Sequence, residues 1–247
     1  MVNSYGKGIY LSVVIPAYNE EKRIEGTLRE IIAYLKNKPF RSEIIVVNDG
    51  SSDKTFDTAK AILDGFEGSQ VVSRTENRGK GYSVREGVLH AVGDIILFSD
   101  ADLSTPIQEF EKLIEWIRKG YDVAIGSRDV KGADIVIHQS WLRECMGKIF
   151  NIFVQAIALR GLKDTQCGFK CFRGKTAQDV FTRQTITGFG FDVEILFIAR
   201  SLDYKIKEVP IQWFNSPRSK VSVLRDPLKM FLDLFKIRLN HILGRYN

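Results

Sequence analysis

The chain has 247 residues, and its 36 lysines and arginines against 30 aspartates and glutamates give a formal net charge of +6. Hydrophobic residues make up 44% and charged residues 27%, which are the proportions of a folded globular domain and exclude wholesale disorder. The three cysteines and three histidines do not recur at metal-ligand spacing, which argues against a disulfide scaffold or a structural zinc site. Any bound metal is therefore expected to be a hard cation with oxygen ligands.

Charge interrupts every apolar run before the roughly 20 residues that a bilayer requires, and residues 1–10 lack the apolar stretch of a signal peptide. We therefore expect no transmembrane segment and a location on the cytoplasmic side. The modest basic excess suits an anionic partner: nucleic acid, a phospholipid surface or a phosphorylated substrate. Composition does not choose among these three.

The first half of the chain alternates short apolar runs with amphipathic stretches. We expect strands at 10–15, 43–47, 70–73, 94–99 and 122–126, and helices at 19–38, 52–63, 81–91 and 107–119, with Pro16 ending the first strand. Continuous apolar strands that alternate with helices predict a parallel sheet covered on both faces. The predicted fold class is therefore α/β, with a Rossmann-like half.

The second half predicts a helix at 139–159, a strand at 207–214 with an edge-type proline, and a helix at 227–243. Both helices combine apolar and basic side chains, so they could lie on a membrane surface without spanning it. Core packing or dimerisation is the alternative for either helix. We expect a tail at 1–10, one domain at 11–225 and a C-terminal amphipathic helix at 226–247.

Chemistry is expected where the strands end, because ligands of open parallel sheets bind beyond the carboxyl ends of the strands. The predicted ends carry an aromatic residue, acidic residues and an arginine, namely Tyr18, Glu20, Asp49, Asp100, Asp102 and Arg128. Two carboxylates one residue apart repel each other unless a cation lies beside them. Mg²⁺ or Mn²⁺ bound with a diphosphate would satisfy them. Asp-x-Asp alone also fits a solvated turn, but its place beside other acidic strand ends favours the metal site.

No GxGxxG or GxxxxGK[ST] motif follows a predicted strand, which argues against a dinucleotide oxidoreductase and a P-loop enzyme. The segments VIPAYNE (14–20), VNDGSSD (47–53), NRGKG (77–81) and DAD (100–102) instead resemble the nucleotide-sugar half of the inverting GT-A glycosyltransferases. DTQCGFK (164–170) and GFDVE (190–194) resemble the branch that uses polyprenyl phosphates. DTQCGFK is more similar to the dolichyl-phosphate β-glucosyltransferases than to the dolichyl-phosphate mannose synthases.

This resemblance implies a GT-A fold, with a nucleotide-sugar half at about 11–130 and an acceptor half at about 131–225. It also implies a donor site that holds the base, ribose and diphosphate. Its residues are Pro16, Tyr18 and Glu20 for base and ribose, Val47 and Asp49 for the base edge, Asp100, Ala101 and Asp102 near ribose and metal, and Lys80, Arg218 and Lys220 for the diphosphate. The segment around Lys80 equally fits a strand-to-helix turn with a solvated lysine, and plain solvation is the alternative for the loop of Arg218 and Lys220.

The resemblance further implies a metal site for Mg²⁺ or Mn²⁺ with Asp102 as the principal ligand, Asp100 beside it, and Ser104 where mannosyl relatives often have glutamine. Arg128 and Arg143 would face the acceptor phosphate, and Asp100, Asp102 and Arg128 are the candidate catalytic residues. A phosphate monoester is already an anion near neutral pH, because its second pKa is about 6. We therefore expect in-line displacement with inversion and no general base.

The expected activity is transfer of a hexose to dolichyl or polyprenyl phosphate, for glycan assembly at a membrane surface. The leading candidate for the donor is UDP-glucose. If a general base is used, Asp192 and Glu194 are the candidates for it. Mannose from GDP-mannose, or an N-acetylhexosamine, remains an alternative donor sugar. A sugar-nucleotide-binding module without catalysis is another possibility. A nucleic-acid binder is disfavoured because the chain offers no arginine-rich recognition helix and no RNA-binding aromatic signature.

Overall fold

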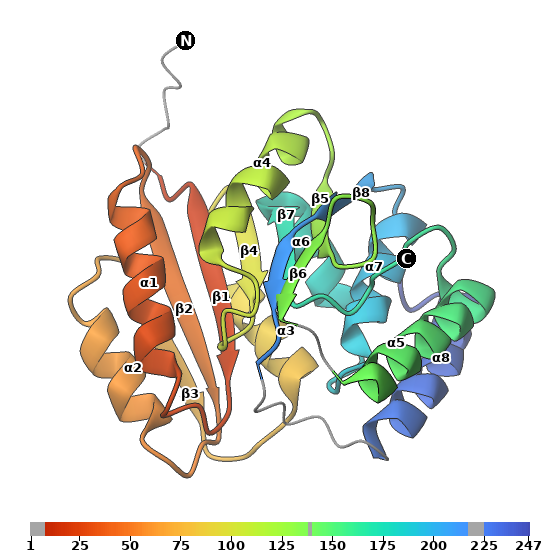
Figure 1. The fold of residues 1–247 in the computed structure, drawn as a ribbon, viewed down its shortest axis with the longest axis horizontal. Helices are drawn as coiled ribbons and strands as arrows, with labels where there is room; N and C mark the ends of the chain where they lie inside the picture. The colour runs from red at the N-terminus through yellow and green to blue at the C-terminus, as the bar shows by residue number, and fades with distance from the viewer. Residues whose placement is uncertain (1–7, 138–139, 217–224) are drawn as a thin grey trace.

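The computed structural model describes residues 8–137, 140–216 and 225–247. A seven-stranded sheet of order β3-β2-β1-β4-β7-β5-β8 forms its centre, and a two-stranded ribbon of β6 and β9 lies beside it (Figure 1). The strands are β1 (Leu11–Ala17), β2 (Ser42–Asp49), β3 (Gln70–Arg74), β4 (Ile95–Ser99), β5 (Val123–Ser127), β6 (Asp134–Ile137), β7 (Phe169–Arg173), β8 (Ile206–Pro210) and β9 (Gln212–Phe214).

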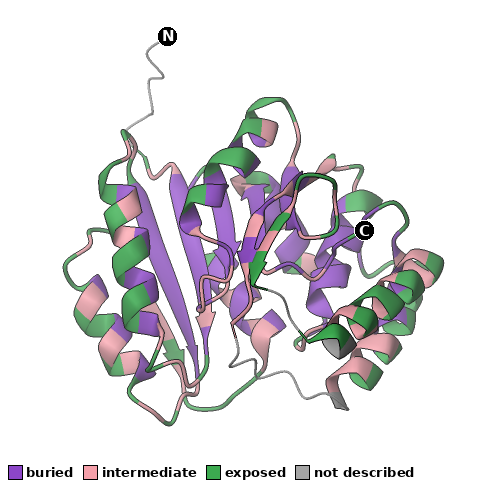
Figure 2. Cartoon of the chain, viewed as in Figure 1, coloured by how far each residue is buried: buried purple, intermediate pink, exposed green. Residues whose placement is uncertain are grey.

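Helices cover both faces of the sheet, as the sequence predicts. They are α1 (Ile24–Lys36), α2 (Thr55–Leu63), α3 (Lys80–His90), η1 (Ile107–Glu109), α4 (Phe110–Arg118), α5 (Trp141–Phe153), the π-helical η2 (Val154–Ala158), α6 (Gly174–Arg183), α7 (Phe191–Ser201) and α8 (Arg225–Ile242). Alternate residues of a strand face opposite sides. Val13 and Ile15 accordingly join the core under α1, α2 and α4, whereas Val14 joins the core under α3, α6 and α7. The strands β1, β2, β4, β5 and β7 are almost wholly buried between these layers, whereas the edge strands β3 and β8 are mostly only partly buried (Figure 2).

The prediction of a parallel sheet is correct for β1 to β4, and β5 and β8 also pair in parallel with each other; it is wrong only for β7. β7 runs antiparallel to both of its neighbours, β4 and β5. The register pairs Ser99, the last residue of β4, with Phe169, the first residue of β7. The chain thus re-enters the sheet from the carboxyl edge of β4, and a strand that enters at that edge must run back along it. No element was expected between residues 160 and 206, where the structure has β7, α6 and α7.

Pro16 does not end the first strand. It lies inside β1 and faces Val47 of β2, whereas the pairing of β1 with β4 covers only residues 11–14. Proline has no N–H to donate, and at this position β1 has a ladder partner on one side only, so the missing donor is tolerated. The expected helix at 19–38 is shorter, from Ile24 to Lys36: Asn19 takes a left-handed φ of 51°, outside helical geometry, and residues 21–23 form a turn.

The expected strand at 207–214 is divided into two strands. β8 forms the edge of the main sheet and ends with Pro210, in agreement with an edge-type proline. After Ile211 the chain continues as β9, which pairs in parallel with β6. Because Ser127 of β5 pairs with Pro210, this break carries the chain across the carboxyl edge of β5, where Arg128 follows.

Helices α5 and α8 lie side by side at one end of the molecule (Figure 1). The rings of Phe153 and Phe231 meet edge to face, with centroids 5.0 Å apart. Leu234 and Ile237 of α8 are fully buried in the core, whereas the opposite faces of both helices expose large apolar side chains, namely Trp141, Ile149, Ile152, Phe153, Leu228, Leu232, Phe235, Leu239 and Ile242. Among the described residues, no helix is both long enough and apolar enough to cross a membrane.

The end of the chain fastens α8 to the core. Tyr246 is fully buried, and its hydroxyl donates a 2.7 Å hydrogen bond to Glu194 of α7. Glu194 is also fully buried and accepts hydrogen bonds from the backbone N–H groups of Thr185 and Ile186. Asn240 of α8 donates to the Thr185 hydroxyl at 2.9 Å. A buried carboxylate requires such donors, so Glu194 holds α7, α8 and the chain end together.

We predict that Tyr246→Phe lowers the free energy of unfolding by about 1–2 kcal/mol, because it removes a donor from a buried carboxylate while keeping the ring. Urea denaturation followed by circular dichroism measures this. The matched control is Tyr204→Phe, whose hydroxyl bonds the partly exposed Asp179 and should therefore cost less. Equal stability of wild type and Tyr246→Phe would show that Glu194 does not depend on this bond.

Candidate active site

Two carboxylates turn out of the sheet directly after β4. Asp100 donates its backbone N–H to the carbonyl oxygen of Gly168 at 3.1 Å. A Cβ on Gly168 would lie 2.0 Å from Asp100 Oδ2, so only glycine permits this approach. Leu103 takes a left-handed φ of 45°, and Asp102 Oδ1 accepts the backbone N–H of Ser104 at 3.0 Å. This tight turn holds the second carboxylate close to the carboxyl edge of β4.

Each of these carboxylates has a basic partner. Lys80 Nζ lies 2.7 Å from Asp100 Oδ1, and Arg23 Nη1 lies 3.7 Å from Asp102 Oδ2. Arg23 is itself oriented by Glu20, which accepts hydrogen bonds of 2.7 and 2.8 Å from its guanidinium. Lys80 is the first residue of α3, so a helix start brings its side chain to the strand ends.

Burial and charge pairing set the protonation of this pair. Burial acts to lower the pKa of Lys80, but the neighbouring Asp100 and Asp192 outweigh it and leave that pKa above its ordinary value. Burial raises the pKa of Asp100. The nearby Lys80 opposes this rise, whereas the negative charges of Asp102 and Asp192 add to it. A further cation beside Asp100 would favour its charged form. The two carboxylates thus form a site that is suited to positive charge.

One cavity of about 730 Å³ connects this acidic rim with the apolar helices. Lys80, Asp100, Asp102, Ser104 and Arg128 line it at the strand ends. Its far part is lined by apolar side chains of α5 and α8, which include Ile149, Phe150, Phe153, Met230 and Phe231. A single ligand, or two ligands that react with each other, could therefore touch both charged and apolar surfaces.

Arg128 is held rigidly where β5 ends. Its guanidinium makes a two-pronged ion pair with Asp164, with Nε–Oδ2 and Nη2–Oδ1 distances of 2.7 and 2.9 Å. The guanidinium carbon lies 5.3 Å from the ring centroid of Trp213. Burial disfavours the charged form of both side chains. Their mutual attraction outweighs burial, so the pKa of Arg128 is raised and the pKa of Asp164 is lowered. Asp164 is positioned in turn by Glu208, which accepts its backbone N–H at 2.9 Å.

The two candidate general bases, Asp192 and Glu194, are both engaged in contacts within the protein. Asp192 lines the cavity but forms an ion pair with Lys170, whose ammonium also donates to the Cys167 carbonyl at 2.6 Å. Glu194 is enclosed by the hydrogen bonds that anchor the chain end. These contacts give both carboxylates structural partners.

The residues predicted to hold the base and ribose lie along the neighbouring strands. Tyr18 is 39% exposed, whereas the side chains of Val47 and Ala101 are buried in the core and Pro16 lies within β1. Asp49 is buried and accepts the backbone N–H groups of Arg78 and Gly79, both at 2.9 Å. It thereby ties the segment that carries Lys80 to the end of β2. The roles of these residues toward a nucleotide stay predictions.

Three predicted residues cannot be placed: Arg218, Lys220 and the side chain of Arg143 lie outside the described part of the structure. The structure adds residues that sequence reasoning did not assign to the site. Asp164 and Gly168 belong to the DTQCGFK segment, which was the available signal for them. Arg23, Lys148, Lys163 and Trp213 carried no such signal.

The donor set fits a divalent cation that is shared with a ligand. Within the described residues, no group of three or more histidine, cysteine, aspartate or glutamate side chains is arranged to hold a metal. Asp100 and Asp102 could nevertheless supply two hard oxygen ligands to such an ion, and both line the cavity together with Ser104. Mg²⁺ characteristically binds through one or two carboxylates together with substrate phosphates and water. The residues present therefore fit a metal–diphosphate complex.

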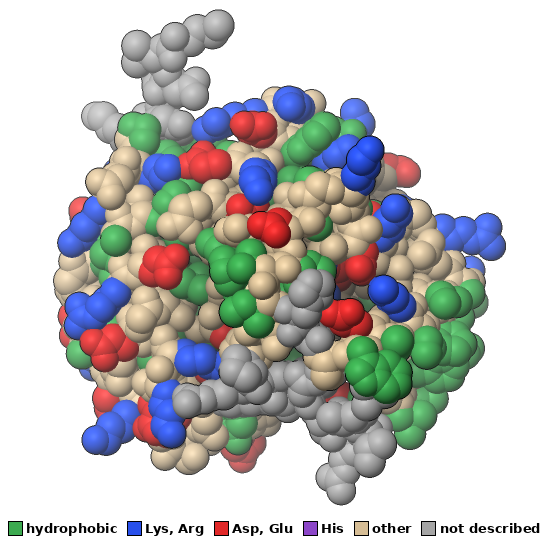
Figure 3. Space-filling view, in the orientation of Figure 1, with side chains coloured by type: hydrophobic (Ala, Val, Ile, Leu, Met, Phe, Trp, Pro, Cys, Tyr) green, Lys and Arg blue, Asp and Glu red, His purple; other side chains and the backbone are tan. Residues whose placement is uncertain are grey.

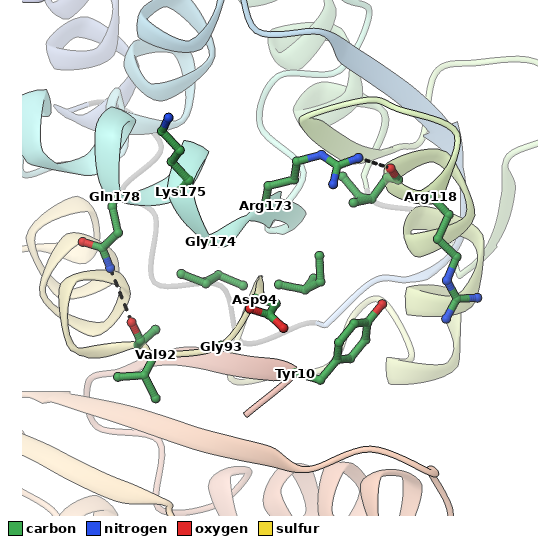
Figure 4. A pocket seen from close by; sticks show the side chains of 13 residues that line it. Tyr10, Val92, Gly93, Asp94, Arg118, Arg173, Gly174, Lys175 and Gln178 are labelled. Atoms are coloured by element: carbon green, nitrogen blue, oxygen red, sulfur yellow. Dashed lines mark hydrogen bonds between the residues drawn. The ribbon is translucent and has the colours of Figure 1, made fainter. Parts of the chain in front are cut away.

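A second cavity, of about 530 Å³, lies at the opposite edge of the sheet, before β4 begins (Figure 4). Arg173 borders it and donates to the carbonyl oxygens of Ile117 and Tyr121 at 2.5 and 3.1 Å. Gln178 reaches across to the carbonyl of Ala91 at 3.4 Å. These polar groups are used to join neighbouring segments of the backbone. The candidate catalytic side chains Asp100, Asp102 and Arg128 line the large cavity at the carboxyl edge of β4 instead.

Comparison with known proteins agrees with this geometry. The family model described as "Glycosyl transferase family 2" matches residues 12–181, which is more than half of the chain. The dolichyl-phosphate beta-glucosyltransferase of Saccharomyces cerevisiae is 39% identical over 256 residues, covering 96% of this chain and 77% of that protein. That of Dictyostelium discoideum is 36% identical over 248 residues, covering 96% and 76%.

Solved structures show the same fold. Glucosyl-3-phosphoglycerate synthase from Mycobacterium tuberculosis, in complex with Mn²⁺, UDP and glucosyl-3-phosphoglycerate, has a TM-score of 0.69 and 20% identity, covering 94% of this chain and 80% of that chain. Mannosyl-3-phosphoglycerate synthase from Rubrobacter xylanophilus has a TM-score of 0.70 and 20% identity, covering 96% and 76%. The GT-A expectation is confirmed. The chain belongs to glycosyl transferase family 2, together with the dolichyl-phosphate beta-glucosyltransferases that it matches along most of its length.

Proposed function

We propose that the protein transfers glucose from UDP-glucose to dolichyl phosphate with inversion, as a peripheral enzyme at the cytoplasmic side of a membrane. The observation that carries this proposal is the continuity of one cavity. It begins at Asp100 and Asp102 and ends among apolar side chains between α5 and α8. A nucleotide sugar needs the charged part, and a lipid phosphate needs both parts.

The donor would lie across the carboxyl ends of β1, β2 and β4, where nucleotides bind in open α/β sheets. Asp100 and Asp102 would hold a Mg²⁺ or Mn²⁺ ion together with the diphosphate. Such an ion offsets phosphate charge and assists departure of the nucleoside diphosphate. The likeness of the chain to dolichyl-phosphate beta-glucosyltransferases supports glucose ahead of the alternative sugars. Ser104, at the third position of the proposed metal site, faces the same cavity.

The acceptor phosphate would approach from the side of α5. Arg128, Lys148 and Lys163 line this part of the cavity, and Asp164 fixes the direction of the Arg128 guanidinium. A phosphate monoester is largely ionised near neutral pH, so its oxygen can attack the anomeric carbon without a protein base. The engagement of Asp192 and Glu194 in internal contacts agrees with this mechanism. The protein then contributes position and charge stabilisation.

The exposed apolar faces of α5 and α8 would dock on the lipid bilayer. Hydrophobic side chains gather over this end of the molecule (Figure 3). Lys148, Lys229 and Lys236 lie on the same two helices and could meet anionic headgroups. Docking in this way would place the apolar end of the cavity against the membrane, so that a polyprenyl chain stays in lipid while its phosphate reaches Arg128.

The donor is tested by transfer of label from UDP-glucose or GDP-mannose to dolichyl phosphate in detergent. We expect organic-extractable label from UDP-glucose, loss of that label with EDTA, and stronger inhibition by UDP than by GDP. Label from GDP-mannose alone would show that the sugar is mannose. Absence of label from both donors, with UDP still bound, would refute the proposed reaction while leaving nucleotide binding in place.

Asp102→Asn should lower the transfer rate at least about 100-fold, because a bound metal supplies several kcal/mol of transition-state stabilisation and each 1.36 kcal/mol is tenfold in rate. The matched control is Asp94→Asn, the same change at the second cavity, which should keep the wild-type rate. Circular dichroism checks that both variants fold. Metal-dependent turnover at the wild-type rate in Asp102→Asn would remove this residue from the metal site.

Membrane docking is tested with the double variant Leu232→Glu/Leu239→Glu in a vesicle flotation assay with phosphatidylcholine and phosphatidylserine. Both leucines are exposed on α8, and burying a leucine side chain contributes about 1.5–3 kcal/mol, so binding should weaken at least about tenfold. Leu89→Glu/Val92→Glu introduces the same charges at exposed apolar positions near the second cavity and should bind like wild type. Equal flotation of both double variants would show that α8 does not dock.

A further inference from the structure

Three acidic side chains of the large cavity each face a basic side chain. Asp100 pairs with Lys80, Asp102 lies near Arg23, and Asp192 pairs with Lys170. Partly buried carboxylates gain from such partners, because an unpaired charge away from water is costly. The cavity therefore already contains positive charge at the place where the proposed metal ion would bind.

Lys80 and Lys170 are not equivalent. Lys170 is fully buried, and its ammonium is held by both Asp192 and the Cys167 carbonyl. The Lys80 side chain is 21% exposed and lines the cavity. Lys80 thus belongs to the surface that a ligand would touch, whereas Lys170 belongs to the core below it.

The backbone beneath Lys80 is fixed while its side chain has room to turn. Gly79 has a left-handed φ of 100°, its N–H is held by Asp49, and a Cβ there would lie 2.6 Å from the Thr187 carbonyl oxygen. Lysine carries its charge on a flexible four-carbon stem. The ammonium can therefore change its partner without movement of α3.

Asp100 cannot serve both cations equally well. A divalent ion ligated by Asp100 would lie within a few ångströms of the Lys80 ammonium, because the ammonium is 2.7 Å from the same carboxylate. Like charges at such a distance in a partly buried site repel strongly. A diphosphate bound beside the metal supplies new anionic oxygens on the same side of the cavity.

We propose that Lys80 is the counter-ion of Asp100 in the free protein. When metal and nucleotide bind together, the Lys80 ammonium leaves Asp100 and contacts the donor diphosphate. Lys80 is then a positioning residue that lowers metal binding in the absence of nucleotide and raises it in the presence of nucleotide. This inference rests on the proposed function, because it takes the donor to be a metal–nucleotide complex. By linkage, UDP must strengthen Mn²⁺ binding by the same factor by which Mn²⁺ strengthens UDP binding.

The test is a titration of the purified protein with Mn²⁺, with and without UDP, followed by electron paramagnetic resonance of the free ion. We expect wild type to bind Mn²⁺ weakly alone and about tenfold or more tightly with UDP, within the usual range of coupling. Lys80→Met should bind Mn²⁺ alone about tenfold more tightly than wild type, and UDP should strengthen it much less. Lys80→Arg, which keeps the charge, should behave like wild type.

Two controls make the result specific. Lys163→Met removes the same charge from the same cavity without touching Asp100, so its Mn²⁺ binding should match that of wild type. Asp102→Asn should abolish the Mn²⁺ binding that responds to UDP, which locates the measured site. Thermal melting of each variant establishes that it is folded before titration.

The proposal is overturned if Lys80→Met binds Mn²⁺ alone no more tightly than wild type, or if UDP strengthens Mn²⁺ binding equally in both proteins. Those results would leave the proposed transfer reaction standing, because wild-type turnover is measured separately. Failure of wild type to bind either Mn²⁺ or UDP would refute the proposed function itself, and the role of Lys80 would fall with it.

Discussion

The pairing of partly or fully buried negative charge with positive charge is the constraint on which this structure depends. Asp100 and Asp102 follow the end of β4, and the surrounding fold supplies a cation for each: Lys80 from the start of α3 and Arg23 from the residue before α1. The same principle repeats in Arg128 with Asp164 and in Lys170 with Asp192. Each pair joins segments that are distant in sequence, so the charges also fix the loops at the carboxyl edge of the sheet.

This arrangement makes the site ready for a charged ligand while it keeps the free protein stable. Basic partners hold the carboxylates in place, and we propose that metal and phosphate replace them when the donor binds. Gly168, which leaves no room for a side chain beside Asp100, brings β7 close enough to support the same turn. The antiparallel strand β7 thus helps to build the site, because the segment that leads into it carries both Asp164 and Gly168.

The second constraint is geometric. The proposed substrates differ completely in polarity, and one cavity has to receive both. Its acidic part lies at the strand ends and its apolar part is lined by side chains of α5 and α8, and Arg128 lines the same cavity. Because Leu234 and Ile237 bury one face of α8 and Tyr246 anchors its end, the opposite apolar face is presented rigidly. A rigid docking face would keep the cavity mouth aligned with the membrane.

Sequence reasoning predicted the first half of the fold and the acidic rim, because apolar strands that alternate with helices determine a parallel sheet and its ligand edge. It did not predict β7, since nothing in residues 160–173 distinguishes an antiparallel strand from a loop or a parallel strand. It also ended β1 at Pro16, because the one-sided pairing there is a property of the sheet. The partners of Arg128 and Asp102 were missed for a similar reason: Asp164 and Arg23 reach them only through tertiary contacts.

The central claim is that metal and nucleotide diphosphate bind together on this paired-charge rim. Anomalous diffraction from crystals grown with Mn²⁺ and UDP-glucose tests it most directly. We predict a manganese peak between Asp100 and Asp102 that is shared with the diphosphate, and the Lys80 ammonium on a phosphate oxygen. Manganese elsewhere, or an intact Lys80–Asp100 ion pair beside a bound diphosphate, would contradict it.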